Sequence, residues 1–242
     1  MTTSVQIIPM ANLALAFLPV IAVIFILYRW SLQAKNAAYS VARMLAQLLL
    51  VGYILASLFQ AESAWLVMGV MLVMVVTASW IALGSVKLYR KPLFKYTFWS
   101  ILTGGGLTLA LVTQLVIDLD PWFETKYMIP LAGMIFANSM NSISLAAERL
   151  QAELVRDVPY DKARSIAFNA AFIPMVNSLF AVGLVALPGM MTGQILSGVS
   201  PIIAAHYQIV VMCMLFGSAG LSTAYFLVLS KSIFTLEKGL QD

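Results

Sequence analysis

The polar side chains inside the apolar stretches of this sequence are neutral. Asn138 and Asn141 lie in IPLAGMIFANSMNSISL, where their spacing predicts one helical face shared with Ser142. Asn177 lies in FIPMVNSLF and Gln208 in AHYQIVV. Amides at membrane depth either form hydrogen bonds between helices or line a substrate path. Both interpretations stay open, and we take Asn138, Asn141, Asn177 and Gln208 as candidate pathway residues.

A second candidate region is VALPGMMTGQILSGVSP, residues 185–201, which carries no charge. Irregular backbone at membrane depth is tolerated only where protein or a cavity surrounds it. The prolines and glycines predict a short helix over MMTGQIL and a turn into the next span, which together form a short re-entrant segment. Met190 and Met191 offer thioethers and Gln194 an amide. The segment is either an outer gate or a structural cap.

Acidic side chains gather in DLDPWFETK, where Asp118, Asp120 and Glu124 form an outer acidic loop. One interpretation is a weak cation site at an entrance or exit of a path. The other is a solvated turn whose aromatic residues lie at the membrane interface.

The segment LAAERLQAELVRDVPYDKARSIAF carries charges of both signs. It predicts a helix that ends before Pro159 and a second helix capped by Asp161. Such a hairpin either docks on a partner in the cytoplasm or stays solvated. We take Glu148, Arg149, Arg156 and Asp161 as candidate coupling residues for such a partner.

The sequence lacks the motifs that several classes of enzyme need. It has no GxxxxGK[ST] phosphate loop, HExxH, CxxC or nucleophile elbow. No Asp or Glu falls inside a predicted span, which argues against a proton-coupled carrier. We therefore expect a protein that is not an enzyme, has no ATPase site and binds no cofactor directly, so any energy that it uses comes from another chain. No metal ligands are assigned, and the single cysteine, Cys213, is expected to be a small buried apolar residue.

The elements that must position these groups are membrane-spanning helices. The chain has 242 residues, of which 62% are hydrophobic and 10% charged, whereas soluble domains average roughly 25% charged residues. We predict an all-α polytopic membrane protein with one transmembrane domain over residues 1–242 and a retained first span. About seven stretches approach the roughly 20 apolar residues that a span needs: 10–28, 44–60, 64–84, 97–117, 128–147, 169–187 and 206–230.

Lysine and arginine fall almost entirely on one side of this seven-span path. They occupy segments 29–43, 85–96, 148–168 and the C-terminal tail, and only Lys126 falls on the opposite side. By the positive-inside rule the N-terminus lies outside and the C-terminus in the cytoplasm. The net charge of +4 therefore reflects topology and gives no reason to expect nucleic-acid binding.

Three stretches resemble a known family. GLVALPGMMTGQILSGVSPIIAAHYQIVVM, ARMLAQLLLVGYIL at 42–55 and IPLAGMIFANSMNSISL at 129–145 are similar to the UPF0014 family, the FetB-type permeases of ABC transporters, which are related to a plant aluminium-sensitive permease. The resemblance covers nearly the whole chain, and LPGMMTG is its most specific part. The loop after the fifth span departs from the family, because it is shorter and lacks a Leu-Gly-Ala stretch.

The resemblance implies the permease subunit of an ABC transporter in the bacterial inner membrane. It implies a separate ABC ATPase as partner, and export of iron or another metal in metal or oxidative stress resistance. A homodimer is expected, because an ATPase dimer drives two membrane halves. The alternative is a nucleotide-independent channel or carrier, or a membrane accessory protein. The side chains themselves do not favour iron, because Fe(III) prefers carboxylates and thioethers favour softer ions.

Overall fold

The computed structural model of the protein describes residues 8–58 and 63–238, and every regular element in these ranges is a helix. One isolated bridge joins Val182 and Ala186. The described chain divides into a smaller unit within residues 1–61 and a larger unit within residues 62–242. The all-α fold of a polytopic membrane protein is confirmed, and the single permease domain over 1–242 stays a prediction.

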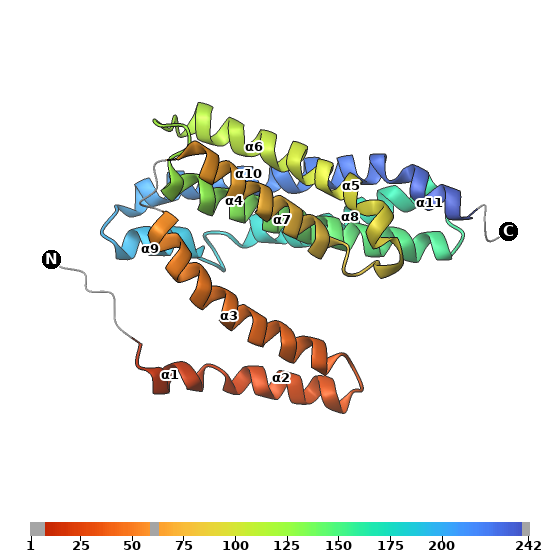
Figure 1. Cartoon of the computed structure of the whole chain (residues 1–242), viewed down its shortest axis with the longest axis horizontal. Helices are drawn as coiled ribbons and strands as arrows, with labels where there is room; N and C mark the ends of the chain where they lie inside the picture. Colours follow the sequence, from red (N-terminus) through yellow and green to blue (C-terminus); the bar gives the residue numbers. More distant parts are fainter. Residues whose placement is uncertain (1–7, 59–62, 239–242) are drawn as a thin grey trace. The chain divides into compact units, whose positions relative to one another are not determined.

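The smaller unit is a helical hairpin. Helix α1 (Met10–Leu15) leads into α2 (Leu18–Arg29), and a short turn that includes Ser31 connects α2 to α3 (Ala34–Leu58). Helices α2 and α3 contact each other, and Figure 1 shows them running in opposite directions. Residues 61–63 separate the spans predicted over 44–60 and 64–84, and residues 59–62 lie outside the described residues.

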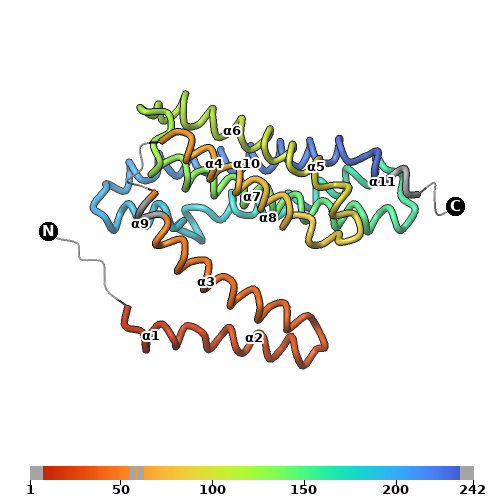
Figure 2. The backbone as a smooth tube through the Cα atoms, in the orientation of Figure 1, coloured from red at the N-terminus to blue at the C-terminus, as the bar shows by residue number. Residues whose placement is uncertain are grey.

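The larger unit is a bundle built around α7 and α10 (Figures 1 and 2). Its first helices are α4 (Ala64–Ala82) and a long element made of η1 (Lys87–Tyr89), α5 (Arg90–Ser100), η2 (Ile101–Gly105), α6 (Gly106–Leu111) and η3 (Val112–Val116). Then follow α7 (Thr125–Val155), α8 (Tyr160–Ala181), α9 (Gly189–Leu196), α10 (Pro201–Leu229) and α11 (Lys231–Lys238). Segments η2 and η3 are π-helical turns.

Six of the seven predicted spans correspond to helices that are long and apolar enough to cross a membrane, among residues 8–58 and 63–238. These spans are Met10–Arg29, Ala34–Ile54, Ala64–Ala82, Lys87–Val116, Thr125–Val155 and Pro201–Leu229. Three of them, Ala34–Ile54, Lys87–Val116 and Thr125–Val155, extend well beyond the predicted apolar cores, because their helices continue into polar flanking residues.

The sixth predicted span, 169–187, differs from the structure. The helix there is α8, which begins nine residues earlier at Tyr160 and ends six residues earlier at Ala181. It is not among the six apolar helices, because its first turns carry Asp161, Lys162 and Arg164. Helix α8 nevertheless packs against both α7 and α10, so the chain follows the predicted path through the bundle.

The segment after α8 matches the predicted short helix. Residues 182–188 form a turn, α9 begins after Pro188, and Gly198 has a φ of 96°, a left-handed conformation that glycine adopts without strain. Pro201 opens α10, and the Ser200 side chain accepts a hydrogen bond from the Ile203 backbone N–H at 3.4 Å. Helix α9 packs against α10 and has no fully buried residue.

Charged side chains of the larger unit separate to the two ends of the bundle. Residues 85–95, 148–164 and 231 lie at the end that carries α11, and residues 118–126 lie at the end that carries α9 (Figures 1 and 2). Figure 2 shows the same grouping along the backbone. This grouping is the one that the predicted topology requires, with the basic end in the cytoplasm.

We expect a cysteine at Asp120 to react with an impermeant maleimide in intact cells, and a cysteine at Lys91 to react only after permeabilisation. We choose Lys91 as the cytoplasmic labelling position because its side chain is exposed. The neighbouring Arg90 is less suitable, because its side chain donates hydrogen bonds to the Trp80 carbonyl oxygen at 2.8 and 3.1 Å. Each cysteine is introduced into a protein that carries Cys213→Ser, because the natural Cys213 is exposed and would itself react with the maleimide. The reverse labelling pattern would overturn the topology.

Candidate functional site

The centre of the larger unit holds a polar contact between α7 and α10. The Asn138 side-chain N–H donates to the Leu215 carbonyl oxygen at 2.8 Å and lies 3.8 Å from the Met175 sulfur of α8. Ser139 donates to the Ser218 carbonyl oxygen at 3.3 Å and accepts from the Ser222 hydroxyl at 3.2 Å. Asn138 therefore joins three helices by hydrogen bonding and close contact, which is the structural interpretation of an amide in a span.

Beside this polar contact, the π-helical turn η2 of the long element between η1 and η3 packs closely on α10. A Cβ atom at Gly104 would lie 2.5 Å from the Ser222 backbone nitrogen and 2.6 Å from its hydroxyl oxygen. Gly104 and Ser222 are both buried. The backbones of η2 and α10 touch at this point, as small residues allow in membrane bundles.

The other predicted pathway amides do not gather around Asn138. Asn141 is exposed on α7, whereas Ser142, expected on the same face, is buried. The prediction that Asn141 and Ser142 share one helical face is therefore wrong in part. Consecutive residues lie about 100° apart around a helix, and of these two only Ser142 faces the core. Asn177 is exposed on α8.

Two predicted pathway residues, Met191 of α9 and Gln208 of α10, do meet in one pocket. This pocket has a volume of about 400 Å³ and is also lined by Met212, Cys213 and Phe216. Gln208 is 6% exposed, and its side-chain oxygen has no hydrogen-bond partner among the described residues. Cys213 was expected to be buried, but it is exposed and lines the pocket.

Met190 and Gln194 lie on α9 outside this pocket. Both are half-buried, and the Gln194 side-chain oxygen is buried without a hydrogen-bond partner in the part of the chain that the structure describes. Helix α9 thus presents Met191 to the pocket, and Gln194 is not among the residues that line it. Whether the segment is a gate or a cap stays open.

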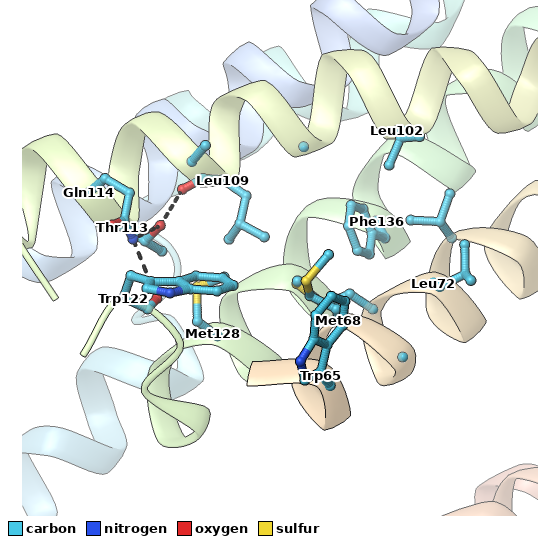
Figure 3. A pocket seen from close by; sticks show the side chains of 15 residues that line it. Trp65, Met68, Leu72, Leu102, Leu109, Thr113, Gln114, Trp122, Met128 and Phe136 are labelled. Carbon is cyan, nitrogen blue, oxygen red and sulfur yellow. Dashed lines mark hydrogen bonds between the residues drawn. The ribbon is translucent and has the colours of Figure 1, made fainter. Parts of the chain in front are cut away.

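A larger pocket, which we call the Trp65–Trp122 pocket, opens between α4, α6 and α7 (Figure 3). Its volume is about 570 Å³, and its walls are almost entirely aromatic and aliphatic. They include Trp65, Met68, Leu72, Leu102, Leu109, Trp122, Met128 and Phe136. The polar side chains at its edge are Thr113, which donates to the Leu109 carbonyl oxygen at 2.9 Å, and Gln114, whose amide donates to the Thr113 hydroxyl at 3.2 Å and the Trp122 carbonyl oxygen at 3.4 Å.

The outer acidic loop folds against the end of this pocket. The Leu119 backbone N–H donates to the Thr113 carbonyl oxygen at 3.0 Å, and Trp122 lines the pocket. Asp118 and Asp120 are exposed and Glu124 is half-buried, and none of the three has an ion pair among residues 8–58 and 63–238.

At the opposite end, the turn between α7 and α8 is fixed by a buried carboxylate. Glu153 is 4% exposed, and one of its oxygens lies 2.7 Å from Arg149 Nη2 and 3.6 Å from Arg156 Nη1. The Glu153 backbone carbonyl oxygen accepts from the N–H groups of Arg156 and Val158. Two predicted coupling residues, Arg149 and Arg156, therefore converge on an acid that the sequence did not single out, whereas Glu148 is exposed on the same helix.

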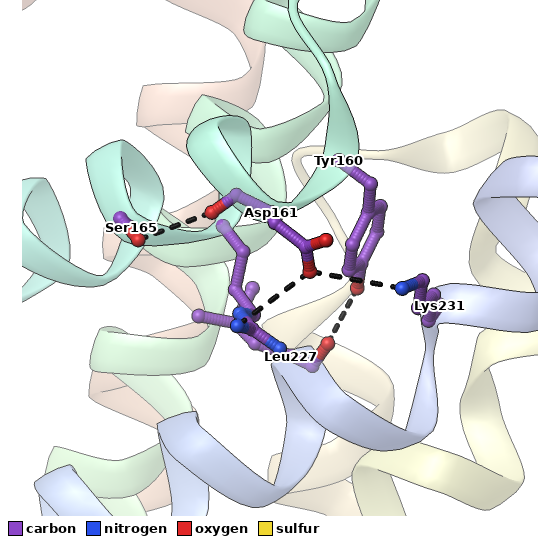
Figure 4. A network of polar contacts seen from close by, with 6 residues as sticks. Tyr160, Asp161, Ser165, Leu227 and Lys231 are labelled. Carbon is purple, nitrogen blue, oxygen red and sulfur yellow. Dashed lines mark hydrogen bonds and ion pairs between the residues drawn. The ribbon is translucent and has the colours of Figure 1, made fainter.

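A second network joins the start of α8 to the end of α10 (Figure 4). Asp161 lies 3.6 Å from Arg164 and 3.6 Å from Lys231, and the Tyr160 hydroxyl donates to the Leu227 carbonyl oxygen. Burial raises the pKa of the Tyr160 phenol, so the group keeps the proton that it donates at neutral pH. Asp161, the fourth predicted coupling residue, thus links the start of α8 to the first residue of α11, while Tyr160 bonds to the end of the last span.

Sequence reasoning missed Glu153, the serine contact around Ser222 and the Trp65–Trp122 pocket. Glu153 had a local signal, because it lies four residues after Arg149 and three before Arg156, the spacing of helical ion pairs. The run GSAGLST at 217–223 signalled close helix packing. The pocket had no local signal, since it combines residues from three helices and a loop.

The fold and these sites define a multi-pass helical membrane protein with a polar bundle centre and a fixed charged turn at one end. The sequence profile of the uncharacterised protein family UPF0014 matches residues 10–159 and 157–234. The chain belongs to this family. The two matched segments meet in the turn between α7 and α8, where the sequence departs from the resemblance.

Named relatives place the chain among membrane permeases. It is 35% identical over 228 residues to the "Probable iron export permease protein FetB" of Escherichia coli, covering 88% of this chain and 86% of that protein. It is 31% identical to "Protein ALUMINUM SENSITIVE 3" of Arabidopsis thaliana, with 88% and 83% covered, and 30% identical to "UPF0014 membrane protein YjkA" of Bacillus subtilis, with 86% and 88% covered. No solved structure matches the chain.

Proposed function

We propose that this protein is the membrane-spanning permease subunit of an ABC transporter that exports iron or another metal from a bacterial cytoplasm. The observation that carries the proposal is the similarity to FetB, which extends over nearly all of both chains. The energy for transport comes from ATP through a separate ATPase subunit. The protein lies in the inner membrane, with the α7–α8 turn on the cytoplasmic side.

The proposed docking surface for the ATPase is the α7–α8 turn. A partner that transmits force needs a surface that holds its shape, and here Glu153 fixes the end of α7 while Asp161 fixes the start of α8. Force applied to the turn reaches the spans directly, because α7 and α8 are continuous with it and Tyr160 bonds to the end of α10.

The proposed assembly is a homodimer. The membrane-embedded surface of one chain exposes the amides of Asn141 and Asn177. An unpaired amide facing hydrocarbon is unfavourable. A second copy that covers these positions would satisfy the amides and place them along a path between the two chains, which supports their assignment as pathway residues.

The proposed path for the metal is lined by neutral side chains. Among residues 8–58 and 63–238, no group of three His, Cys, Asp or Glu side chains is placed to hold an ion. The amides Asn141, Asn177 and Gln208 and the thioethers of Met190 and Met191 bind hard cations weakly. A path of this kind suits a metal that passes as a chelate, or one that is held only briefly.

Co-expression with candidate ABC ATPases tests the proposal. We expect one ATPase and this protein to co-purify with two copies of each chain, and the permease to stimulate ATP hydrolysis in proteoliposomes. Inside-out vesicles should accumulate radioactive iron only when ATP is present. Flux of the same size without ATP, in vesicles where no ATPase co-purifies, would instead favour the channel or carrier.

A further inference from the structure

We propose that the Trp65–Trp122 pocket binds lipophilic organic cations, with the apolar body between α4 and α7 and the positive group toward the outer acidic loop. This ligand class differs from an exported metal, and the proposal does not depend on an ATPase partner. It combines three features of one end of the bundle: the walls of the pocket, its aromatic rings and the charge beside it.

The walls of the pocket select an apolar body. Its volume of about 570 Å³ falls within the range of roughly 300–1,000 Å³ that is usual for small-molecule sites. Met68, Leu72 and Phe136 provide apolar surface away from Gln114 and Trp122 (Figure 3). An inorganic ion has no apolar surface to bury there.

The polar groups at the edge do not favour an anion. The Thr113 hydroxyl already donates to the Leu109 carbonyl oxygen, and the Gln114 amide donates to Thr113 and to the Trp122 carbonyl oxygen. An anionic group would meet the electron-rich faces of Trp65 and Trp122 instead. Indole faces attract cations, and quaternary ammonium groups bind in sites of this kind.

The charge beside the pocket has the sign that a cation requires. Residues 118–126 hold three carboxylates and one lysine, so their net charge is 1 − 3 = −2. The hydrogen bonds from Leu119 to Thr113 and from Gln114 to Trp122 tie this loop to the helix that forms the pocket wall. Lys126 reduces this negative charge, but none of Asp118, Asp120 and Glu124 lies within ion-pair distance of a cation among the described residues.

Binding of tetraphenylphosphonium to the full chain in lipid nanodiscs tests the proposal, with empty nanodiscs subtracted. Tetraphenylborate has the same shape and the opposite charge. We expect saturable binding of the phosphonium at one site per chain and no saturable binding of the borate. Asp118→Asn with Asp120→Asn, and separately Trp65→Leu, should each weaken phosphonium binding about fivefold, the size of one cation–aromatic or charge interaction.

Matched controls separate the site from general effects. Trp99→Leu removes an exposed tryptophan that does not line the pocket, and Glu148→Gln removes an acid at the opposite end. Both should leave phosphonium affinity unchanged. Equal saturable binding of phosphonium and borate would show that the pocket binds apolar molecules whatever their charge, and this result would overturn the proposal. So would phosphonium binding that never saturates, or that is as strong in the Trp65→Leu protein.

Discussion

Replacing Gly104 with alanine is expected to lower the melting temperature of the protein by about 6 to 12 °C. The added Cβ would lie 2.5 Å from the Ser222 nitrogen and 2.8 Å from its Cα, and backbone atoms cannot rotate away as a flexible side chain can. Overpacking a tight core costs about 1–3 kcal/mol, and each kcal/mol lowers the melting temperature of a chain this long by about 2–4 °C. We place this substitution at the upper end because the clash is with backbone.

The clash also reaches the polar centre of the bundle. The same Cβ would lie 2.6 Å from the Ser222 hydroxyl, which donates to Ser139. Moving Ser222 would break this hydrogen bond in a buried place where no water replaces it. The backbone clash and the loss of the Ser222–Ser139 hydrogen bond have one cause, so both should contribute to one fall in melting temperature.

Gly106→Ala is the matched control in the same long element between η1 and η3. A Cβ at Gly106 would have only Leu102 Cδ1 within reach, at 4.0 Å, so the change should be neutral or slightly stabilising through helix propensity. Thermal unfolding of both variants in the same detergent, followed by tryptophan fluorescence, makes the comparison. Equal melting temperatures for the two variants would contradict the close approach of η2 to α10.

The membrane fold could be predicted from the sequence because its signal is local. Each span carries its own run of apolar residues, and the lysine and arginine positions need only be counted along the chain. The short helix after Pro188 was also predictable, since Pro188, Gly198 and Pro201 act on their own backbone. The sixth span was misplaced because apolar character continues through the turn at 182–188, where the helix has already ended.

The site was harder to predict because it depends on which side of a helix each residue faces. Asn138 and Asn141 differ by three positions in the sequence, yet Asn138 bonds to α10 and Asn141 is exposed. Met191 and Gln208 share a pocket only because α9 folds back against α10. Contacts between distant segments of this kind leave no pattern in either segment alone.

Loss of the Glu153 carboxylate is expected to uncouple the proposed ATPase while leaving the bundle folded. In Glu153→Gln, Arg149 and Arg156 lose the acid on which they converge, and the turn loses its fixed geometry. Both arginines are partly exposed, so water solvates them and the melting temperature should fall by only a few degrees. We expect ATPase stimulation to fall about tenfold, which corresponds to roughly 1.4 kcal/mol of lost interaction.

Two further variants identify the cause of this loss. Asp161→Asn breaks only exposed ion pairs to Arg164 and Lys231, so the melting temperature should not change. If the α8 side of the turn also contacts the ATPase, this variant should lower the stimulation of ATP hydrolysis as Glu153→Gln does. Ser165→Ala removes a hydroxyl that donates to the Asp161 backbone oxygen and touches none of these charges, so it should stimulate ATP hydrolysis as the natural protein does. Measuring ATP hydrolysis and melting temperature on each reconstituted variant separates coupling from folding. If Glu153→Gln stimulates the ATPase normally, whether or not its melting temperature falls, the α7–α8 turn is not the coupling surface, and the ATPase must act through another part of the cytoplasmic end.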